Sequence, residues 1–266
     1  MTPRPLGTLP ALPEERVLKT LRTYRQGPVL TVELHVPEQG NVVTDAMLDD
    51  LLEVLHEQDP AVRVVVLAGA GDDFSLGGDR GEFARHLTHD SGAGGVRVSG
   101  AKARRVCDAL GENPAVTIAR LHGKVVGAGL ALALACDLRV AADDATFRLP
   151  ELALGLPSAW GGVLPRLVSE AGAARARELV LTGRSFTAQE AVHLSVLQKA
   201  VPAHELDAAV AAWAGPVARR PAAALRVTKT LFHSLSAATR MADVSALDAE
   251  LMAAVVSELH HARAGG

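Results

Sequence analysis

The sequence predicts an α/β core followed by a region built of helices alone. Residues 62–68 and 115–121 are almost continuously apolar, which is typical of strands in a sheet covered on both faces. Segments with apolar residues at helical spacing lie between such runs. From about residue 204 onward the chain is rich in alanine and leucine and carries no strand pattern. Strand–helix units followed by helices alone indicate a core with a helical appendage.

The first unit of the core reads as strand, helix, strand. Residues 29–36 alternate apolar with polar side chains and predict a strand. Thr44 can cap a helix that carries Asp45 in its first turn. The apolar stripe of this helix consists of Met47, Leu48, Leu51, Leu52 and Leu55. Pro60 ends the helix before the strand at residues 62–68.

The middle of the chain continues to alternate strands and helices. Apolar runs predict strands at residues 115–121, 137–142 and 146–149. Helical patterns predict helices at residues 96–110, 161–168, 173–181 and 187–194. The last of these begins with a capping box formed by Thr187 and Glu190. The glycine-rich residues 89–95 predict a flexible loop.

Three regions follow from this pattern. The proline-rich residues 1–16 predict a disordered lead-in. Residues 17–203 form the α/β core, and residues 204–266 form the helical region, with breaks expected at Pro216 and Pro221. Helical appendages of this kind often pack between subunits, so we expect an oligomer.

Composition and charge exclude several classes of protein. The net charge of −3 argues against a nucleic-acid binder, which needs a basic face. The longest apolar run, residues 125–136, reads as a buried helix and is too short to span a membrane. Cys107 and Cys136 form no disulfide or metal pattern, so a reducing cytoplasm is expected and Cys136 is expected in the core. No histidine has metal-ligand spacing, and no metal is expected.

Two glycine turns and one carboxylate carry the chemistry. Residues 74–79 read FSLGGD, residues 122–129 read HGKVVGAG, and residues 148–151 read RLPE. Two exposed turns can direct two backbone N–H donors at one oxygen, and a nearby carboxylate can then move a proton. This combination stabilises an enolate. The alternative is that the glycines only permit tight turns and that Glu151 is a solvated side chain.

Four separated blocks resemble the crotonase superfamily, the enoyl-CoA hydratases and isomerases. The blocks are NVVT at residues 41–44, VRVVVLAGAGDDFSLGGD at 62–79, HGKVVGAGLALALACDLRVAADDATFRLPELALGLPSAWGGVLPRL at 122–167, and LVLTGRSFTAQEAVHLSVLQKAV at 179–201. The resemblance extends from about residue 17 to residue 202. It implies a spiral of ββα turns with a C-terminal helical region that forms a homotrimer or a homohexamer.

The resemblance also implies a site. The backbone N–H groups of Gly78 and Ala128 would form the oxyanion hole, although the family usually has glycine where this chain has Ala128. Of the two glutamates used by the family's hydratases, one corresponds to Glu151 and the other is replaced by Ala131. The residues expected at the substrate pocket are Trp160, Ala131, Leu76 and Arg80. Trp160 can equally be a core residue, and Arg80 can be an ordinary surface arginine.

With a single glutamate, isomerisation of an enoyl thioester is favoured over hydration, because one carboxylate can take a proton from one carbon and return it to another. A hydratase that uses Glu151 alone remains an alternative, as does a non-catalytic acyl-thioester-binding or scaffold protein. The expected partner is an acyl-CoA or acyl-carrier-protein thioester. Coenzyme A or phosphopantetheine would enter as part of the substrate, with no further cofactor.

Overall fold

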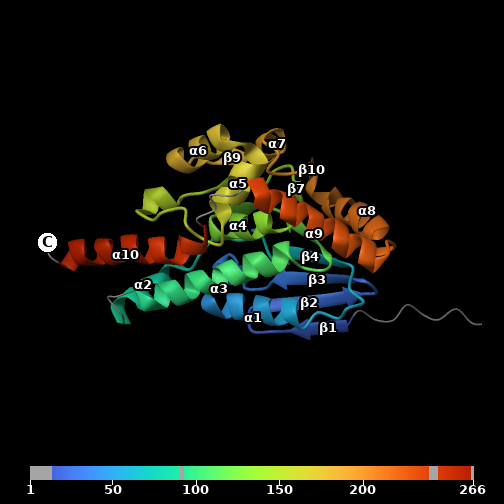
Figure 1. The fold of residues 1–266 in the computed structure, drawn as a ribbon, viewed down its shortest axis with the longest axis horizontal. Coiled ribbons are helices and arrows are strands. Elements are labelled where there is room, and N and C mark those ends of the chain that lie inside the picture. Colours follow the sequence, from blue (N-terminus) through green and yellow to red (C-terminus); the bar gives the residue numbers. More distant parts are fainter. Residues whose placement is uncertain (1–13, 90–92, 240–244, 265–266) are drawn as a thin grey trace, which may run out of the picture.

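A seven-stranded sheet forms the centre of the molecule and confirms the predicted α/β class (Figure 1). The computed structural model describes residues 14–89, 93–239 and 245–264. Across the sheet the strands follow the order β1 (Glu14–Val17), β2 (Leu21–Gln26), β3 (Val29–Leu34), β4 (Val64–Gly69), β5 (Val116–Leu121), β7 (Leu138–Ala142) and β10 (Lys199–Val201). The β1–β2 and β2–β3 pairs are antiparallel, and the remaining pairs are parallel.

A smaller sheet and ten helices complete the described part of the chain. The small sheet has the order β6 (Lys124–Val126), β8 (Thr146–Arg148) and β9 (Phe186–Thr187). The helices of the core are α1 (Asp45–His56), α2 (Arg80–His89), α3 (Gly94–Gly111), α4 (Ala128–Ala135), α5 (Val163–Ala171), α6 (Ala173–Thr182) and α7 (Ala188–His193). The C-terminal helices are α8 (Leu206–Ala218), α9 (Ala222–Thr239) and α10 (Asp248–Ala264).

The central strands are buried on both faces, as their continuous apolar sequences predict. In β4, Val65 and Leu67 belong to the main core, whereas Val64 and Val66 face a second cluster that includes Leu206 of α8. The helices after residue 204 therefore pack against the core. In Figure 1, α10 extends past α2 and α3, and its Met252 and Val256 share a third cluster with Val96 of α3.

Local signals explain how several helices begin. The Thr44 hydroxyl accepts a hydrogen bond from the Met47 amide at 3.1 Å, as predicted for the cap of α1. The Thr187 hydroxyl caps α7 in the same way, by accepting from the Glu190 amide at 3.2 Å. The Glu190 carboxylate, however, pairs with Arg184. The capping box is therefore only half formed.

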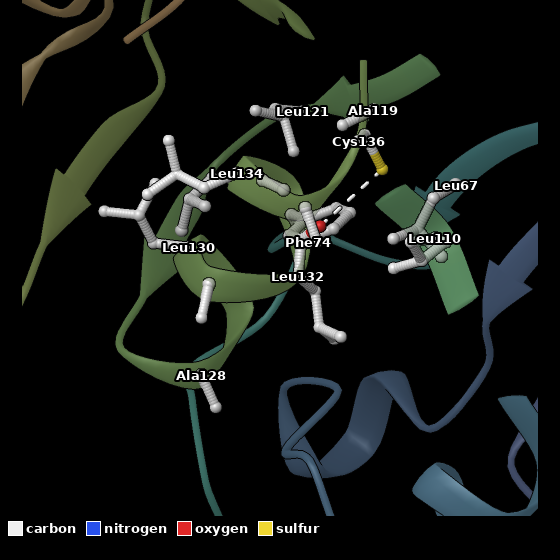
Figure 2. Close-up of a cluster of buried hydrophobic side chains, with 14 of the residues drawn as sticks. Leu67, Phe74, Leu110, Ala119, Leu121, Ala128, Leu130, Leu132, Leu134 and Cys136 are labelled. Atoms are coloured by element: carbon white, nitrogen blue, oxygen red, sulfur yellow. Dashed lines mark hydrogen bonds between the residues drawn. The ribbon is translucent and has the colours of Figure 1, made fainter. Parts of the chain in front are cut away.

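Helix α4 is buried on every side (Figure 2). Its sequence AGLALALA has no polar side chain, and such a helix is stable only inside a core. Figure 2 shows Phe74 beside it and Ala128 at its first turn. Cys136, just after its end, is 3% exposed, which confirms that it is a core residue.

Several predictions about the elements were wrong. Residues 14–16, assigned to the disordered lead-in, belong to β1, and residues 1–13 lie outside the described residues. Helix α4 begins at Ala128 because β6 occupies the residues before it. Pro216 lies inside α8 without ending it. The predicted loop at residues 89–95 contains the first turn of α3, and residues 90–92 are not described.

Two buried cations hold these layers together, and neither was expected. Lys229 of α9 donates to the Ala115 carbonyl at 2.9 Å and lies 2.7 Å from the Asp137 carboxylate. Arg139 of β7, 1% exposed, donates to the carbonyl oxygens of Val196 and Cys136. A buried charge that is hydrogen-bonded in this way ties separate segments to one geometry.

Candidate active site

The two glycine turns lie side by side, although about fifty residues separate them in the sequence. Ser75 and Val125 form an isolated parallel bridge. The Ser75 amide donates to the Lys124 carbonyl at 3.2 Å, and the Val126 amide donates to the Ser75 carbonyl at 3.0 Å. This pairing brings the turns together: a Cβ atom added to Gly127 would lie 4.0 Å from the Gly77 Cα atom.

The first turn presents the Gly78 amide through its pairing with Val43. The Val43 amide donates to the Gly77 carbonyl at 2.8 Å, and the Asp79 amide donates to the Val43 carbonyl at 3.1 Å. A trans peptide joins Gly77 to Gly78, and in such a peptide the carbonyl and the following N–H point to opposite sides. The Gly78 N–H therefore points away from Val43, and Gly78 lines the cavity described below.

The second turn presents its amide through the start of a helix. Gly127 has φ 50° and ψ −116° and immediately precedes α4. Ala128 is the first residue of α4, so its N–H has no acceptor within the helix. The N-terminal end of a helix also favours a negative charge. Ala128 lines the same cavity as Gly78.

Glu151 reaches this place through the small sheet. Val126 of β6 is paired with Arg148 of β8, and the Gly127 amide donates to the Arg148 carbonyl at 3.0 Å. Glu151 follows three residues later, in a single 3-10 turn. Its Oε1 atom would be 2.9 Å from a Cβ atom at Gly127. The carboxylate therefore lies directly beside the second turn.

The surroundings of Glu151 favour its neutral form. Burial raises the pKa of Glu151, because the ionised carboxylate loses its hydration. A backbone hydrogen bond and the Ser158 hydroxyl, which lies 3.4 Å from Oε2, act in the opposite direction but more weakly. A glutamate with a raised pKa is better matched to proton transfer near neutral pH than an ordinary one.

A cavity of about 550 Å³ connects these groups. The expected residues that line it are Gly78, Ala128, Glu151, Leu76, Arg80 and Trp160. Trp160 also packs against the main core, so both interpretations of this side chain hold. Arg80 is exposed at the cavity. Ala131 is the exception: it is fully buried within α4 and does not line the cavity.

Sequence reasoning missed part of the cavity wall. Phe83 and His86 come from α2, Val96 from α3 and Met252 from α10. Met252 is more than 150 residues from Val96, so no local pattern could place them together. Glu82 and His86 stand four residues apart on one helix, a spacing that could have indicated a shared face.

Two further carboxylates line the cavity, but both are engaged by backbone amides. The Asp79 Oδ1 atom accepts from the amides of Gly81 at 2.7 Å and Glu82 at 3.1 Å. The Glu82 Oε2 atom accepts from the Asp45 amide at 2.8 Å. Among the carboxylates that line the cavity, Glu151 is the one that lies beside the second turn.

The structure also shows the surroundings of the two cysteines and of His122. Burial raises the pKa of Cys107 and of Cys136 to about 12, so neither thiol is a nucleophile near neutral pH. The His122 Nε2 atom lies 2.8 Å from the Gly71 carbonyl and supports the loop before the first turn. Among the described helices, none combines the length and the apolar character needed to cross a membrane.

Known proteins share both the sequence pattern and the fold. The family model described as Enoyl-CoA hydratase/isomerase matches residues 24–265. The mevalonyl-coenzyme A hydratase of Aspergillus fumigatus is 32% identical over 211 residues, which cover 77% of this chain and 74% of that protein.

Two solved structures illustrate the similarity of the fold. An enoyl-CoA hydratase/carnithine racemase from Magnetospirillum magneticum superposes with a TM-score of 0.77 at 30% identity, over 82% of each chain. A Thermobifida fusca protein in complex with acetoacetyl-CoA gives a TM-score of 0.74 at 30% identity, over 92% of this chain and 95% of that one. This chain belongs to the enoyl-CoA hydratase/isomerase family, the crotonase superfamily.

Proposed function

We propose that this protein is an enzyme that moves a proton next to the carbonyl of an acyl-CoA thioester, with isomerisation of an enoyl-CoA as its main reaction. The amides of Gly78 and Ala128 hold the thioester oxygen as it becomes an enolate oxygen. Glu151 removes a proton from one carbon and returns it to another. The observation that carries the proposal is the convergence of both turns and the partly buried Glu151 carboxylate on one cavity.

The enolate is stabilised where its charge develops. Two amides that are fixed by the fold need no rearrangement during the reaction, and removing one such donor typically costs a factor of about 10²–10³ in rate. The start of α4 adds the favourable field of a helix end. The apolar wall formed by Phe83, Val96 and Trp160 would hold the acyl group and exclude water.

The arrangement of acids favours isomerisation over hydration. Hydration of a double bond needs a group that orients and deprotonates water and help in protonating carbon. In this chain the position of the second hydratase glutamate is Ala131, which is buried in α4. Asp79 and Glu82 are already occupied by backbone amides. Glu151 alone is sufficient for a proton shuttle between two carbons.

Hydration by Glu151 alone is the second candidate, because the Aspergillus fumigatus relative carries the name of a hydratase. The two reactions are separated by their products. Incubation with a trans-3-enoyl-CoA should give a conjugated trans-2-enoyl-CoA, detected by its ultraviolet absorbance. A hydratase would instead convert a trans-2-enoyl-CoA to a 3-hydroxyacyl-CoA without acting on the 3-enoyl isomer.

Coenzyme A is proposed as the carrier over an acyl carrier protein. The support comes from the family membership and from the acetoacetyl-CoA complex of the Thermobifida fusca neighbour. Turnover of the same acyl group on both carriers tests this choice, and a preference for the carrier-protein thioester would reverse it.

The Glu151→Gln substitution tests the mechanism. It keeps the size of the side chain but removes the proton carrier, so we expect turnover to fall by about 10²–10⁴ while thioester binding persists. Solvent-proton exchange at the α or γ carbon, followed by NMR in D₂O, should stop in the variant. Exchange that continues unchanged would remove Glu151 from the mechanism. Binding without any exchange in the unaltered protein would indicate a non-catalytic family member.

The proposal includes self-association as a homotrimer or homohexamer. Helix α9 exposes Val227, Leu231 and Leu235 at successive spacings of four residues, with Phe232 next to Leu231, and their exposed fractions run from 57% to 68%. An apolar face of this kind is usually covered by a partner. Light scattering should therefore give a mass several times that of the chain, and Phe232→Glu should lower it.

A further inference from the structure

We propose that Asp45, Glu82 and His86 form a binding site for a divalent transition-metal ion in the wall of the cavity. The proposal is independent of the proposed reaction, because neither Glu151 nor the two glycine turns take part. The spacing of Glu82 and His86 alone does not indicate a metal site, since the third ligand, Asp45, lies on a different helix.

The fold brings the three side chains to one point. Glu82 and His86 are four residues apart on α2 and therefore share one face of this helix. Asp45 is the first residue of α1, and its amide donates to the Glu82 Oε2 atom at 2.8 Å. One ligand atom from each of the three side chains lies within 4.8 Å of the other two.

Two buried atoms of this cluster lack a hydrogen bond. The His86 Nε2 atom and the Asp45 Oδ1 atom accept or donate none within the part of the chain that the structure describes. Nε2 lies 3.4 Å from the other Asp45 oxygen, Oδ2, which is an ion-pair contact rather than a hydrogen bond. Buried polar atoms are nearly always hydrogen-bonded, so two such atoms in one cluster indicate a missing group.

A metal ion satisfies this arrangement better than a hydrogen bond does. One imidazole nitrogen and two carboxylates are ligands that Zn²⁺ and neighbouring first-row metals accept. The two carboxylates offset the charge of the ion, and too few oxygens are present for a Ca²⁺ site. Glu82 and His86 also line the cavity, so an ion held there borders the space proposed for the acyl group.

Metal binding to the full-length, tag-free protein tests the proposal. After treatment with a chelator, the protein should bind one equivalent of Co²⁺ and show visible absorption bands of a coordinated ion. Zn²⁺ should displace the Co²⁺ and remove these bands. His86→Gln and Asp45→Asn should each weaken binding by at least about tenfold, the scale on which even supporting groups around a metal act.

Two controls separate this site from other histidines. His35→Gln removes a partly buried histidine that lies 3.2 Å from a single carboxylate, that of Glu33. His260→Gln combined with His261→Gln removes the adjacent pair near the C-terminus. Both variants should bind the metal like the unaltered protein. Circular dichroism verifies that each variant is folded.

Three results would overturn the proposal. The first is the absence of stoichiometric binding at micromolar free metal. The second is binding that folded His86→Gln and Asp45→Asn retain in full. The third is binding that disappears in the His260/His261 variant and persists in His86→Gln.

Discussion

The two turns at the cavity reach the same result through different local structures. The first is a glycine turn held by hydrogen bonds to Val43, and the second is the beginning of the buried helix α4. In both turns the residue that must be glycine precedes the proposed donor. Gly77 has φ 95°, and an added Cβ would lie 3.0 Å from the Val126 carbonyl. Gly127 has φ 50°, and an added Cβ would lie 2.9 Å from the Glu151 carboxylate.

The donor residues themselves are under no such constraint. A Cβ atom at Gly78 would meet nothing within 4 Å, and its φ is not in the left-handed range. Ala128 already carries a methyl group, next to the core at the start of α4 (Figure 2). The departure from glycine at Ala128 therefore leaves the backbone donor in place. In each turn, the glycine is constrained and the donor residue that follows it is not. Substitution of each residue tests this contrast.

Gly127→Ala should have the largest effect. It forces a side chain into a conformation that only glycine readily adopts and pushes a methyl group against Glu151. We expect a loss of about 1–3 kcal/mol in unfolding free energy from the strained backbone. Turnover should fall by about 10²–10³, the cost of a misplaced donor. Urea unfolding and steady-state kinetics measure the two effects.

A matched control separates strain from position. Gly27, at the β2–β3 hairpin, has φ 57° and open space around its Cα atom. Gly27→Ala should lose stability but keep its turnover. Equal losses of turnover in the two variants would show that the kinetic effect reports general strain rather than the geometry of the second turn.

Gly77→Ala should have a smaller effect on turnover, because its methyl group would meet the Val126 carbonyl and leave the Glu151 carboxylate in place. A displacement of the first turn by about 1 Å can still cost a factor of about 10² in turnover. The pH dependence of the residual activity should match that of the unaltered protein, since Glu151 is untouched. A pH profile that differs from that of the unaltered protein would mean that a change at the first turn also reaches Glu151, so the two turns would not act separately.

The two turns could be predicted from the sequence because the residues that form each turn are neighbours along the chain. Glycine pairs after apolar strands, the Thr44 cap and the continuous runs of β4 and β5 are all short-range features, and they all appear in the structure. The position of Glu151 came from the family resemblance rather than from any pattern. Ala131 was expected at the pocket but does not line it, because α4 is buried on all sides and a spacing along a helix does not say which face meets the cavity.

Other elements of the fold have no clear pattern in the sequence. Strands β6 and β9 have only three and two residues, which is too short to show an alternating pattern. β2 reads LRTYRQ, with Leu21 as its only aliphatic residue, so it shows no alternation of apolar and polar side chains. Helix α2 carries no clear apolar stripe. A lysine in a sequence usually indicates a solvated surface, so the buried Lys229 could not be foreseen.

The carboxylate beside the second turn should also make stability depend on pH. Burial raises the pKa of Glu151 in the folded state above its ordinary value of 4.5. Between these two values the folded protein binds more protons than the unfolded chain, so this group lowers stability as the pH rises. Glu151→Gln has no carboxylate at this position and therefore does not lose stability in this way as the pH rises. Its stability relative to the unaltered protein should increase from about pH 4.5 upward and then level off.

Urea unfolding at a series of pH values measures this difference. Glutamine can still accept the hydrogen bond of Ser158, which keeps the comparison to the charge alone. A difference in unfolding free energy between the variant and the unaltered protein that stays constant across the pH range would contradict a partly buried Glu151. If the variant instead became less stable than the unaltered protein as the pH rises, the surroundings of Glu151 would favour its ionised form.

Gly78→Ala should have the smallest effect, even though it changes a proposed donor residue. The amide remains, the backbone conformation suits any residue, and the methyl group enters open space. Stability should change by no more than about 0.5 kcal/mol, as for other unconstrained exposed positions. Turnover should stay far above that of Gly127→Ala, with any loss appearing in KM, because the methyl group borders the cavity. If Gly78→Ala instead lost turnover as severely as Gly127→Ala, the first turn would need glycine at the donor itself, and the two turns would not follow the same rule.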